Sequence, residues 1–208
     1  MYFFKSPLIQ RLIFGQFVWK VNNVDKNLYL TFDDGPTEEV TDYVLDTLDQ
    51  YNAKATFFVV GKNVEKSPET LLKVLKAGHS VGNHTYSHVS GWKTNSAYYE
   101  NDTSKCDRVL GEMNITTNLF RPPYGRINIR SIKKISLKKS IIMWGFLSGD
   151  FDQKLNIQKS LSSIKGMKSG EIIVFHDTKK AFDNLKTLLP ETLDHFDKLG
   201  YQFKKIEI

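Results

Sequence analysis

The segment LYLTFDDGPTEEVTDYVLDTLDQYNAKATFFVV, residues 28–60, contains a complete strand–helix–strand unit. Leu28–Phe32 is a short apolar run typical of a strand buried on both faces, and Lys54–Val60 predicts a second strand. Residues 38–51 between them predict a helix whose apolar stripe consists of Val40, Val44 and Leu48. Because a helical connection leaves the two strands parallel, the segment predicts a parallel sheet covered by helices.

The rest of the chain repeats this alternation. Apolar periodicity and turn residues predict helices over residues 67–77, 96–113, 128–138, 157–165 and 182–199, the last one bent or divided by Pro190. Strands are predicted over residues 79–82, 118–120, 140–144, 171–175 and 201–206. About seven strand–helix units in one domain-sized chain predict an α/β fold, a single-domain barrel of the (β/α)7 type that is either complete or incomplete. We expect residues 1–27 to be an N-terminal extension that packs on or beside a barrel domain of residues 28–208.

Composition and charge narrow the class of protein. The 208 residues are 40% hydrophobic and 25% charged, which excludes collagen-like, low-complexity and wholly disordered chains. Lys plus Arg number 29 and Asp plus Glu number 23, so the formal charge is 29 − 23 = +6. Such a surface attracts any anionic partner. The densest basic run, at residues 133–139, lies in a predicted helix, and no nucleic-acid-binding motif is present, so we expect no nucleic-acid partner.

Cysteine content and apolar runs set further limits. Cys106 is the only cysteine, so a metal site must use His, Asp or Glu, and no internal disulfide can form. No apolar run reaches the roughly 18 residues of a transmembrane helix. The apolar stretch 1–19 is interrupted by Gln10, Arg11 and Gln16 and lacks a small-residue cleavage site. We expect no transmembrane segment and no cleavable signal peptide, with this stretch packed on the domain in preference to a weak interfacial anchor.

Polar residues follow the predicted strands at their carboxyl ends. These residues are Asp33, Asp34, His84, His88, Arg121, Asp150 and His176. In a parallel barrel those ends share one face, where catalytic residues gather. Their common location therefore favours a functional site over a set of unrelated polar residues.

Each group also has a purely structural explanation. Residues 33–36, DDGP, are good turn formers. The two prolines after Arg121 favour a rigid turn, and His176 could form a satisfied core pair with Asp177. A general acid at His176 is the other possibility, because histidine titrates near neutral pH.

The two histidines at His84 and His88 have the spacing of metal ligands. Four residues apart, on a helical turn or in a tight loop, they bring both imidazoles toward one point. As surface or capping residues they would need no metal. With a nearby aspartate they form a three-ligand site that leaves positions open for water and substrate, which is the catalytic arrangement. We expect one divalent metal ion, with Zn²⁺ favoured and Co²⁺ or another divalent ion as the alternative.

Four motifs resemble those of the polysaccharide deacetylases, the NodB-homology group of carbohydrate esterase family 4. TFDDGP at 31–36 is similar to the first motif, HTYSH at 84–88 to the second, RPPYG at 121–125 to the third and IVFHD at 173–177 to the last. They follow the family's order and span most of the chain. The resemblance implies an irregular (β/α) barrel, with residues 28–208 as the catalytic domain.

The resemblance also implies a role for each matching residue. These roles are catalytic base for Asp33, metal ligands for Asp34, His84 and His88, a partner of the base for Arg121 and general acid for His176. Substrate contacts are implied for Pro123, Tyr124 and Val174, with the Tyr124 amide beside the oxyanion and Val174 near the acetyl methyl group.

The fourth motif departs from the family pattern. Members commonly show Asp-x-x-Asp-Trp after a strand that contains Trp, whereas residues 144–152 here read WGFLSGDFD. Asp150 best fits the carboxylate that orients the acid histidine, and Asp152 is the alternative. Phe151 stands where the family has Trp, which puts the aromatic wall of the site in question.

These observations predict a metal-dependent hydrolase that removes N-acetyl groups from GlcNAc-containing glycans of the peptidoglycan or chito-oligosaccharide type. Amide hydrolysis needs an activated water, a stabilised oxyanion and a protonated leaving nitrogen. The alternatives are an amide hydrolase or deformylase acting on a small or lipid-linked sugar, which a closed cleft would favour, and a sugar-binding protein without activity. We expect the protein to be a monomer whose partner is its glycan substrate. A cytoplasmic or peripheral membrane location is favoured over export. Three aromatic residues, Trp92, Tyr98 and Tyr99, are expected to pack against a helix in preference to stacking on sugars.

Overall fold

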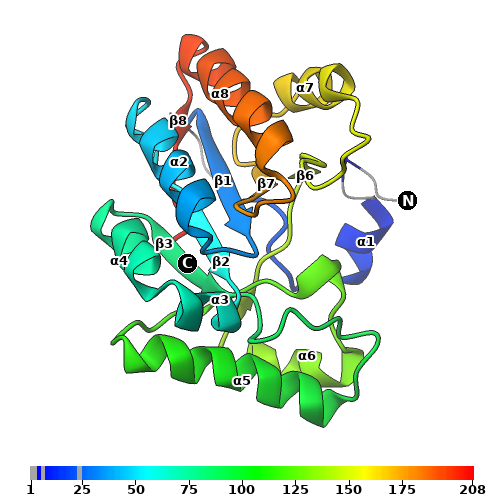
Figure 1. Ribbon diagram of the computed structural model, residues 1–208. Helices are drawn as coiled ribbons and strands as arrows, with labels where there is room; N and C mark the ends of the chain where they lie inside the picture. Colours follow the sequence, from blue (N-terminus) through cyan, green and yellow to red (C-terminus); the bar gives the residue numbers. More distant parts are fainter. Residues whose placement is uncertain (1–3, 6–7, 23–24) are drawn as a thin grey trace.

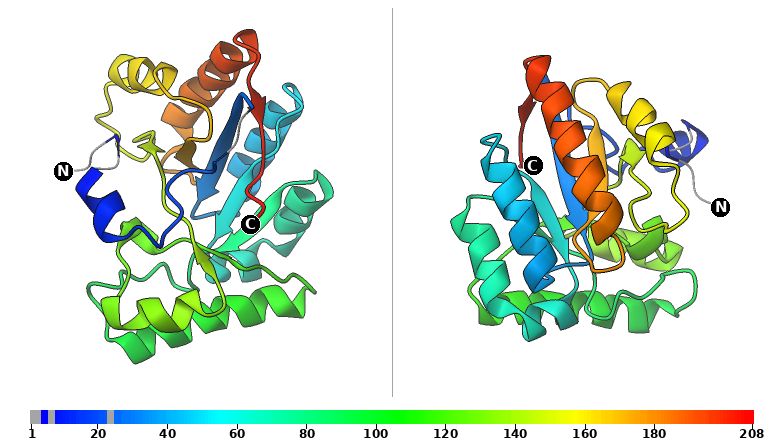
Figure 2. Two further views of the ribbon diagram at one scale, coloured as in Figure 1. Left: turned by 180° about the vertical axis from the view of Figure 1, so that it is seen from behind. Right: turned by 45° about the horizontal axis from the view of Figure 1, so that its top comes forward.

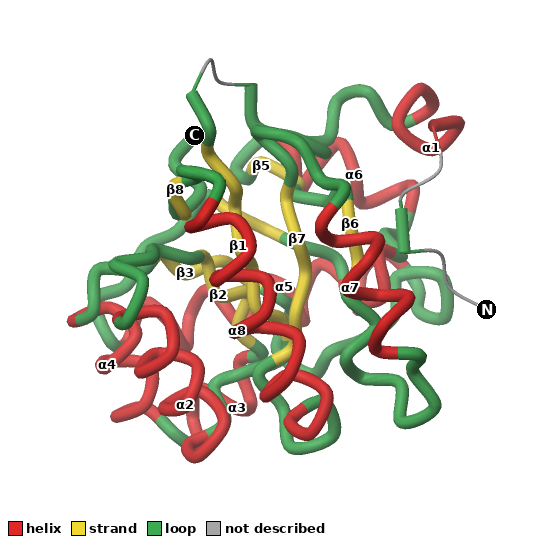
Figure 3. The backbone as a smooth tube through the Cα atoms, turned by 90° about the horizontal axis from the view of Figure 1, so that it is seen from above, coloured by secondary structure: helices red, strands yellow, loops and turns green. Residues whose placement is uncertain are grey.

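The computed structural model describes residues 4–5, 8–22 and 25–208 and shows one parallel sheet surrounded by helices (Figure 1). The strands are β1 (Asn27–Asp33), β2 (Thr56–Val59), β3 (Ser80–Asn83), β4 (Leu119–Phe120), β5 (Ser140–Ile141), β6 (Phe146–Leu147), β7 (Ile172–His176) and β8 (Gln202–Phe203). They follow the order β5–β4–β3–β2–β1–β7–β6, and β8 pairs with the beginning of β1. The sheet curls into an open barrel with β1 near its middle, which confirms the predicted fold class (Figure 3).

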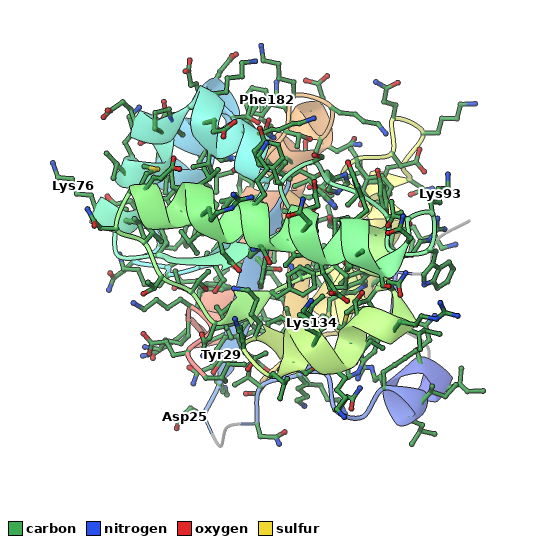
Figure 4. The ribbon with its side chains drawn as sticks, turned by 90° about the horizontal axis from the view of Figure 1, so that it is seen from below. Asp25, Tyr29, Lys76, Lys93, Lys134 and Phe182 are labelled. Atoms are coloured by element: carbon green, nitrogen blue, oxygen red, sulfur yellow. The ribbon has the colours of Figure 1, made fainter. Side chains whose placement is uncertain are left out.

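The helices follow the strands as predicted, with two additions. They are α1 (Leu8–Ile13), α2 (Glu38–Asp49), α3 (Gly61–Lys66), α4 (Pro68–Lys76), α5 (Ser96–Glu112), α6 (Ile129–Ser136), α7 (Ile157–Lys165) and α8 (Phe182–Lys198), with a 3₁₀ turn η1 (Pro123–Gly125). Figure 4, seen from below, shows α5 and α6 side by side, and the ammonium of Lys134 on α6 lies 2.6 Å from the carboxylate of Glu100 on α5. Two helices were not predicted. One is α1, in the N-terminal extension. The other is α3, which begins directly after β2 and has no apolar stripe, since Val64 is its only large buried side chain.

The side chains of β1 face two different cores in alternation. Its three apolar residues Leu28, Leu30 and Phe32 pack in the main core against the helices. On the other face, Tyr29 packs with Phe58 inside the barrel, and Thr31 and Asp33 both bond to Arg121. All seven residues of β1 are buried, so the prediction of a strand buried on both faces is confirmed. Because alternate residues of a strand face the same side, the polar side chains of Thr31 and Asp33 both lie on the inner face, near the carboxyl end of the strand.

Strand β5 is shorter than the predicted run of residues 140–144. It ends at Ile141 because the next two carbonyl groups leave the ladder. The carbonyls of Ile142 and Met143 accept hydrogen bonds from the Arg121 guanidinium at 3.3 and 3.0 Å. The Met143 N–H donates to the carbonyl of Val18 at 2.7 Å. The chain then forms β6, a strand of two residues that the sequence pattern did not indicate.

Of the two alternatives predicted for the last helix, division at Pro190 is wrong, because α8 runs unbroken from Phe182 to Lys198, while a bend at Pro190 stays a prediction. Proline has no N–H to donate to the carbonyl four residues earlier, which belongs to Lys186. The hydroxyl of Tyr43 on α2 donates to that carbonyl instead, at 3.3 Å. A side chain from the neighbouring helix thus compensates for the missing backbone bond.

The described part of the N-terminal extension lies across the open side of the sheet, between β5 and β6 (Figure 2, left). Lys5 forms a backbone bridge with Phe146 in β6, and Val18 forms one with Ile142 just after β5. The predicted domain boundary at residue 27 stays a prediction, and residues 1–3, 6–7 and 23–24 of the extension lie outside the described residues. Within the described ranges, no helix has the length and apolar character needed to cross a membrane.

Candidate active site

The predicted polar residues gather around a cleft of about 460 Å³ at the carboxyl ends of the strands. Its lining residues are Asp33, Asp34, His84, His88, Tyr124, Arg126, Trp144, Leu147, Phe151, His176, Thr178 and Lys180. A larger hollow of about 670 Å³ lies at the opposite ends of the strands, near Ser80, Leu119 and Ile208. The larger hollow has one acidic residue, Glu207, in its lining and no histidine. The smaller cleft is therefore the candidate site, because titratable residues gather in its lining, although its volume is not the larger of the two.

Asp34, His84 and His88 form a cluster with the dimensions of a metal site. Asp34 Oδ1 lies 2.9 Å from His88 Nε2 and 3.4 Å from His84 Nε2, and one ligand atom from each residue lies within 4.8 Å of the others. Burial opposes ionisation of Asp34, but the adjacent imidazoles of His84 and His88 hold its pKa well below the ordinary value. The residues can therefore offer a carboxylate and two imidazole nitrogens to one cation.

The tautomer of His84 strengthens this interpretation. Its Nδ1 lies 2.7 Å from the carbonyl oxygen of Arg121, which can only accept a hydrogen bond. In the neutral ring the proton is then on Nδ1, and Nε2 presents its lone pair to the Asp34 carboxylate. Two lone pairs face each other there, so a proton or a metal ion must lie between them. The donor set fits a divalent ion such as zinc.

The segment that carries both histidines is a tight loop and not a helical turn. Thr85 and His88 have left-handed backbone angles, with φ of 63° and 55°. The buried carboxylate of Asp102 on α5 holds the loop, since it accepts the N–H groups of Tyr86 at 3.1 Å and Ser87 at 2.9 Å and the Ser87 hydroxyl at 2.9 Å. Asp102 could not be assigned to the site from the sequence, because an aspartate in a polar helix is ordinarily a surface residue.

The loop after β1 is supported by a second residue that the sequence analysis did not assign to the site. Asp177 accepts the N–H of Gly35 at 3.1 Å and the hydroxyl of Thr41 at 2.6 Å. A Cβ atom at Gly35 would lie 2.0 Å from Asp177 Oδ2, so only glycine fits there. Burial raises the pKa of Asp177 to about 7. On the other side of the loop, Asn63 on α3 donates to the Asp34 carbonyl at 2.7 Å. The hydrogen bonds that hold the turn therefore also hold Asp34, which belongs to the metal cluster.

Arg121 and Asp33 form a buried ion pair. Arg121 is fully buried, and its Nη1 donates to Asp33 Oδ1 at 2.7 Å and to the Thr31 hydroxyl at 2.7 Å. Its guanidinium also lies over the ring of Phe58, 4.1 Å from the centroid. With the two backbone carbonyls that it bonds after β5, the guanidinium is held on several sides. Arg121 can therefore fix the Asp33 carboxylate at the floor of the cleft.

His176 and Asp150 form the second pair. His176 Nδ1 lies 2.7 Å from Asp150 Oδ1, and the His176 backbone N–H donates to Asp150 Oδ2 at 2.7 Å. Burial lowers the pKa of His176, but the charge and hydrogen bond of Asp150 outweigh it and raise the pKa to about 9. Of the two candidates from the sequence, Asp150 makes these contacts, while Asp152 Oδ1 accepts the N–H of Lys154 at 3.0 Å. His176 can therefore hold a proton at neutral pH.

The walls of the cleft are aromatic and apolar. The Phe151 ring stands edge-on to His176, with centroids 5.0 Å apart, so phenylalanine supplies an aromatic surface at the position that departs from the family pattern. Tyr124 is 61% exposed, has a φ of 61°, and its ring centroid lies 4.6 Å from that of His88. Pro123 and Val174 are buried and do not appear among the described residues that line the cleft, so their contact with substrate stays a prediction.

The comparisons with known proteins agree with this geometry. Residues 20–138 match the family described as polysaccharide deacetylase. A peptidoglycan-N-acetylglucosamine deacetylase from Bacillus cereus is 33% identical over 194 residues, which cover 91% of this chain and 90% of that protein. The chain belongs to the polysaccharide deacetylase family. The resemblance based on four motifs is thus confirmed, and with it the enzyme class of the family, metal-dependent hydrolases that act on N-acetyl amide bonds.

Other members of the polysaccharide deacetylase family extend the likeness. The peptidoglycan-N-acetylglucosamine deacetylase PgdA of Listeria monocytogenes is 33% identical over 184 residues, which cover 88% of this chain and 38% of that longer protein. The crystal structure of the Bc1960 peptidoglycan N-acetylglucosamine deacetylase superposes with a TM-score of 0.81 at 29% identity, covering 92% of this chain and 91% of that one. The deacetylase fold therefore accounts for nearly the whole of this chain.

Proposed function

We propose that this protein is a metal-dependent N-deacetylase of GlcNAc-containing glycans, of the peptidoglycan or chito-oligosaccharide type. One observation carries the proposal. A single cleft combines a carboxylate bound by a buried arginine, a histidine charged by a buried aspartate, and an Asp–His–His cluster. The names of the relatives support peptidoglycan as the class of glycan.

Asp34, His84 and His88 would hold the metal ion. We propose Zn²⁺, because two imidazole nitrogens and one carboxylate oxygen are a donor set that zinc prefers, with Co²⁺ as the alternative. Such an ion supplies a Lewis acid that lowers the pKa of water and polarises the acetyl carbonyl. With three protein ligands, the site leaves room for water and substrate.

Asp33 acts as the general base. Arg121 binds Oδ1 of its carboxylate, which leaves the other oxygen to accept a proton from the attacking water. The buried guanidinium also keeps the carboxylate in one orientation, so no reorientation is needed when the proton moves. Attack of the water oxygen on the acetyl carbon produces a tetrahedral oxyanion, and the backbone N–H of Tyr124 would stabilise it.

His176 acts as the general acid. Its Nδ1 is engaged by Asp150, so Nε2 is the nitrogen that can donate to the amide nitrogen of the substrate. The carbon–nitrogen bond then breaks, the amine leaves with the proton from His176, and acetate remains. The apolar side chains of Trp144, Leu147 and Phe151 line the cleft and can accommodate the acetyl methyl group.

The proposal is tested by measuring acetate release from N-acetylated chito-oligosaccharides and from peptidoglycan fragments. Metal-loaded protein should release acetate and an equal amount of free amine. Treatment with a chelator should stop the reaction, and Zn²⁺ or Co²⁺ should restore it. The absence of acetate release from all of these glycans by metal-loaded protein would contradict the proposal. In that case, release of formate or acetate from a small or lipid-linked amino sugar would favour the alternative hydrolase, and no release at all would favour a binding protein.

A further inference from the structure

Two cationic side chains line the cleft beyond the groups that the proposed reaction uses. These are Arg126 and Lys180. Each lies over an aromatic ring, Arg126 over Trp92 at 5.1 Å and Lys180 over Phe151 at 5.9 Å. Among the described residues, neither cation has a carboxylate within ion-pair distance. Both charges are therefore available to a ligand in the cleft.

Trp92 and Arg126 form a fixed pair although they lie far apart in the sequence. The N–H of Gly91 donates to the carbonyl of Arg126 at 2.9 Å, and the Asn128 side chain donates to the carbonyl of Thr94 at 3.0 Å. A Cβ atom at Gly91 would lie 2.3 Å from the Asn128 nitrogen, so glycine allows the two segments to approach this closely. The loop before α5, which Lys93 marks in Figure 4, is thereby joined to the segment after η1.

The exposure of Trp92 corrects the expectation that it packs against a helix. Its side chain is 69% exposed, whereas Tyr99, for which the same expectation was made, is fully buried. A tryptophan ring at the surface, in a loop that is joined to the segment of Arg126, offers a flat apolar surface beside that arginine. The guanidinium of Arg126 lies over that ring and also lines the cleft near Tyr124.

The charges that line the cleft favour an anionic ligand. The two carboxylates in the lining are Asp33, bound to Arg121, and Asp34, in the metal cluster. The remaining charged groups are His176, Arg126 and Lys180, all of which are or can be cationic. Of the two exposed cations, only the arginine has a planar fork that matches a carboxylate with two parallel hydrogen bonds.

We propose that Arg126, backed by Trp92, is a carboxylate-binding subsite. It would make the enzyme prefer N-acetylated glycans that carry a carboxylate beside the acetamido sugar over neutral ones. The sugar ring next to the reacting residue would pack on Trp92 while its carboxylate is bound by the Arg126 fork. This inference rests on the proposed deacetylase function and narrows its substrate class.

The test compares two forms of one substrate. A peptide-free glycan of alternating GlcNAc and N-acetylmuramic acid is prepared as the free acid and with its carboxylates converted to primary carboxamides, which removes the charge and keeps the shape. For the wild-type protein we expect kcat/KM for the acid to exceed that for the carboxamide by about tenfold or more, mainly through KM, because a charge-assisted hydrogen bond is lost in the carboxamide. Equal values for the two forms would overturn the inference, while acetate release from both would leave the proposed function intact.

Single substitutions identify the residue that causes the preference for the free acid over the carboxamide. Arg126→Gln should bring the acid-to-carboxamide ratio to about one, and Arg126→Lys should leave an intermediate ratio, since lysine keeps the charge without the fork. Arg130→Gln removes an exposed arginine outside the cleft lining and should leave the ratio unchanged. If Lys180→Gln abolishes the preference and Arg126→Gln does not, the assignment to Arg126 is wrong. If acetate is released neither from these glycans nor from neutral chito-oligosaccharides, the proposed function fails as well.

Discussion

Asp33 and His176 are the last residues of two adjacent parallel strands, β1 and β7, and their Cα atoms are paired in register. The two side chains therefore enter the cleft side by side from the same edge of the sheet. Each is held by an oppositely charged and buried partner, Arg121 for Asp33 and Asp150 for His176. A base that must be anionic and an acid that must be cationic can thus stand next to each other in one site.

Replacing Asp150 should change the pH dependence of catalysis. In Asp150→Asn, burial would continue to lower the pKa of His176, while the largest of the charges that raise this pKa is removed. The acid must be protonated to act, so activity is lost as the pH rises through the pKa of His176. The alkaline limb of the kcat/KM profile should therefore move to lower pH, with a fall in kcat as well.

Asp152→Asn provides the matched control, because Asp152 was the other candidate for this role. Its pH profile should keep the alkaline limb of the wild-type protein. If the limb moved in Asp152→Asn and stayed in place in Asp150→Asn, the assignment of the orienting carboxylate would be reversed.

Removing one metal ligand should remove the metal. His88→Ala leaves two of three ligands in the cluster, and the metal content per chain, measured by elemental analysis after dialysis, should fall well below one. His195→Ala, a histidine of α8 outside the cleft, should retain the wild-type content. Retention of a full equivalent of metal in His88→Ala would place the ion elsewhere.

Asp102 should affect metal binding without touching the metal. Asp102→Ala removes the acceptor for two backbone N–H groups and one hydroxyl in the loop that carries His84 and His88. We expect a loss of about 1–3 kcal/mol in the free energy of unfolding and a weakening of metal affinity by about 10–100-fold. Urea unfolding and a competitive chelator titration measure the two effects. A variant with wild-type values in both would show that the loop holds its shape by itself.

The buried pair of Arg121 and Asp33 should show strong coupling. Arg121→Met leaves Asp33 as an unpaired charge in a buried position, which typically costs about 3–5 kcal/mol of stability. The double variant Asp33→Asn with Arg121→Met removes that charge and should recover part of the loss. Additive effects of the two substitutions in urea unfolding would mean that the two side chains do not stabilise each other.

Those parts of the fold and site that depend on local sequence could be predicted. The apolar run that ends at Asp33 and the one that ends at His176 define both strands and the residues at their ends. The parallel order then brings these ends to one face. Asp102 and Asn63 could not be found in this way, because they reach the site only through contacts between distant segments.

The incorrect expectations have the same physical cause. The unbroken helix around Pro190 depends on a hydroxyl from Tyr43, and the early end of β5 depends on carbonyl groups that turn toward Arg121. The surface position of Trp92 depends on the bond from Gly91 to Arg126. In each case a tertiary contact overrides a local preference, and a single sequence does not display such contacts.

The most direct test of the account is the turnover of Asp33→Asn measured together with its metal content. The amide keeps the size of the side chain and cannot accept the proton of water as a base. We expect one equivalent of metal per chain, as in the wild-type protein, and a fall in kcat for acetate release of about 10²–10⁴-fold. Metal-loaded Asp33→Asn with a kcat within about tenfold of the wild-type value would contradict the assignment of Asp33 as the base, and with it the proposed mechanism.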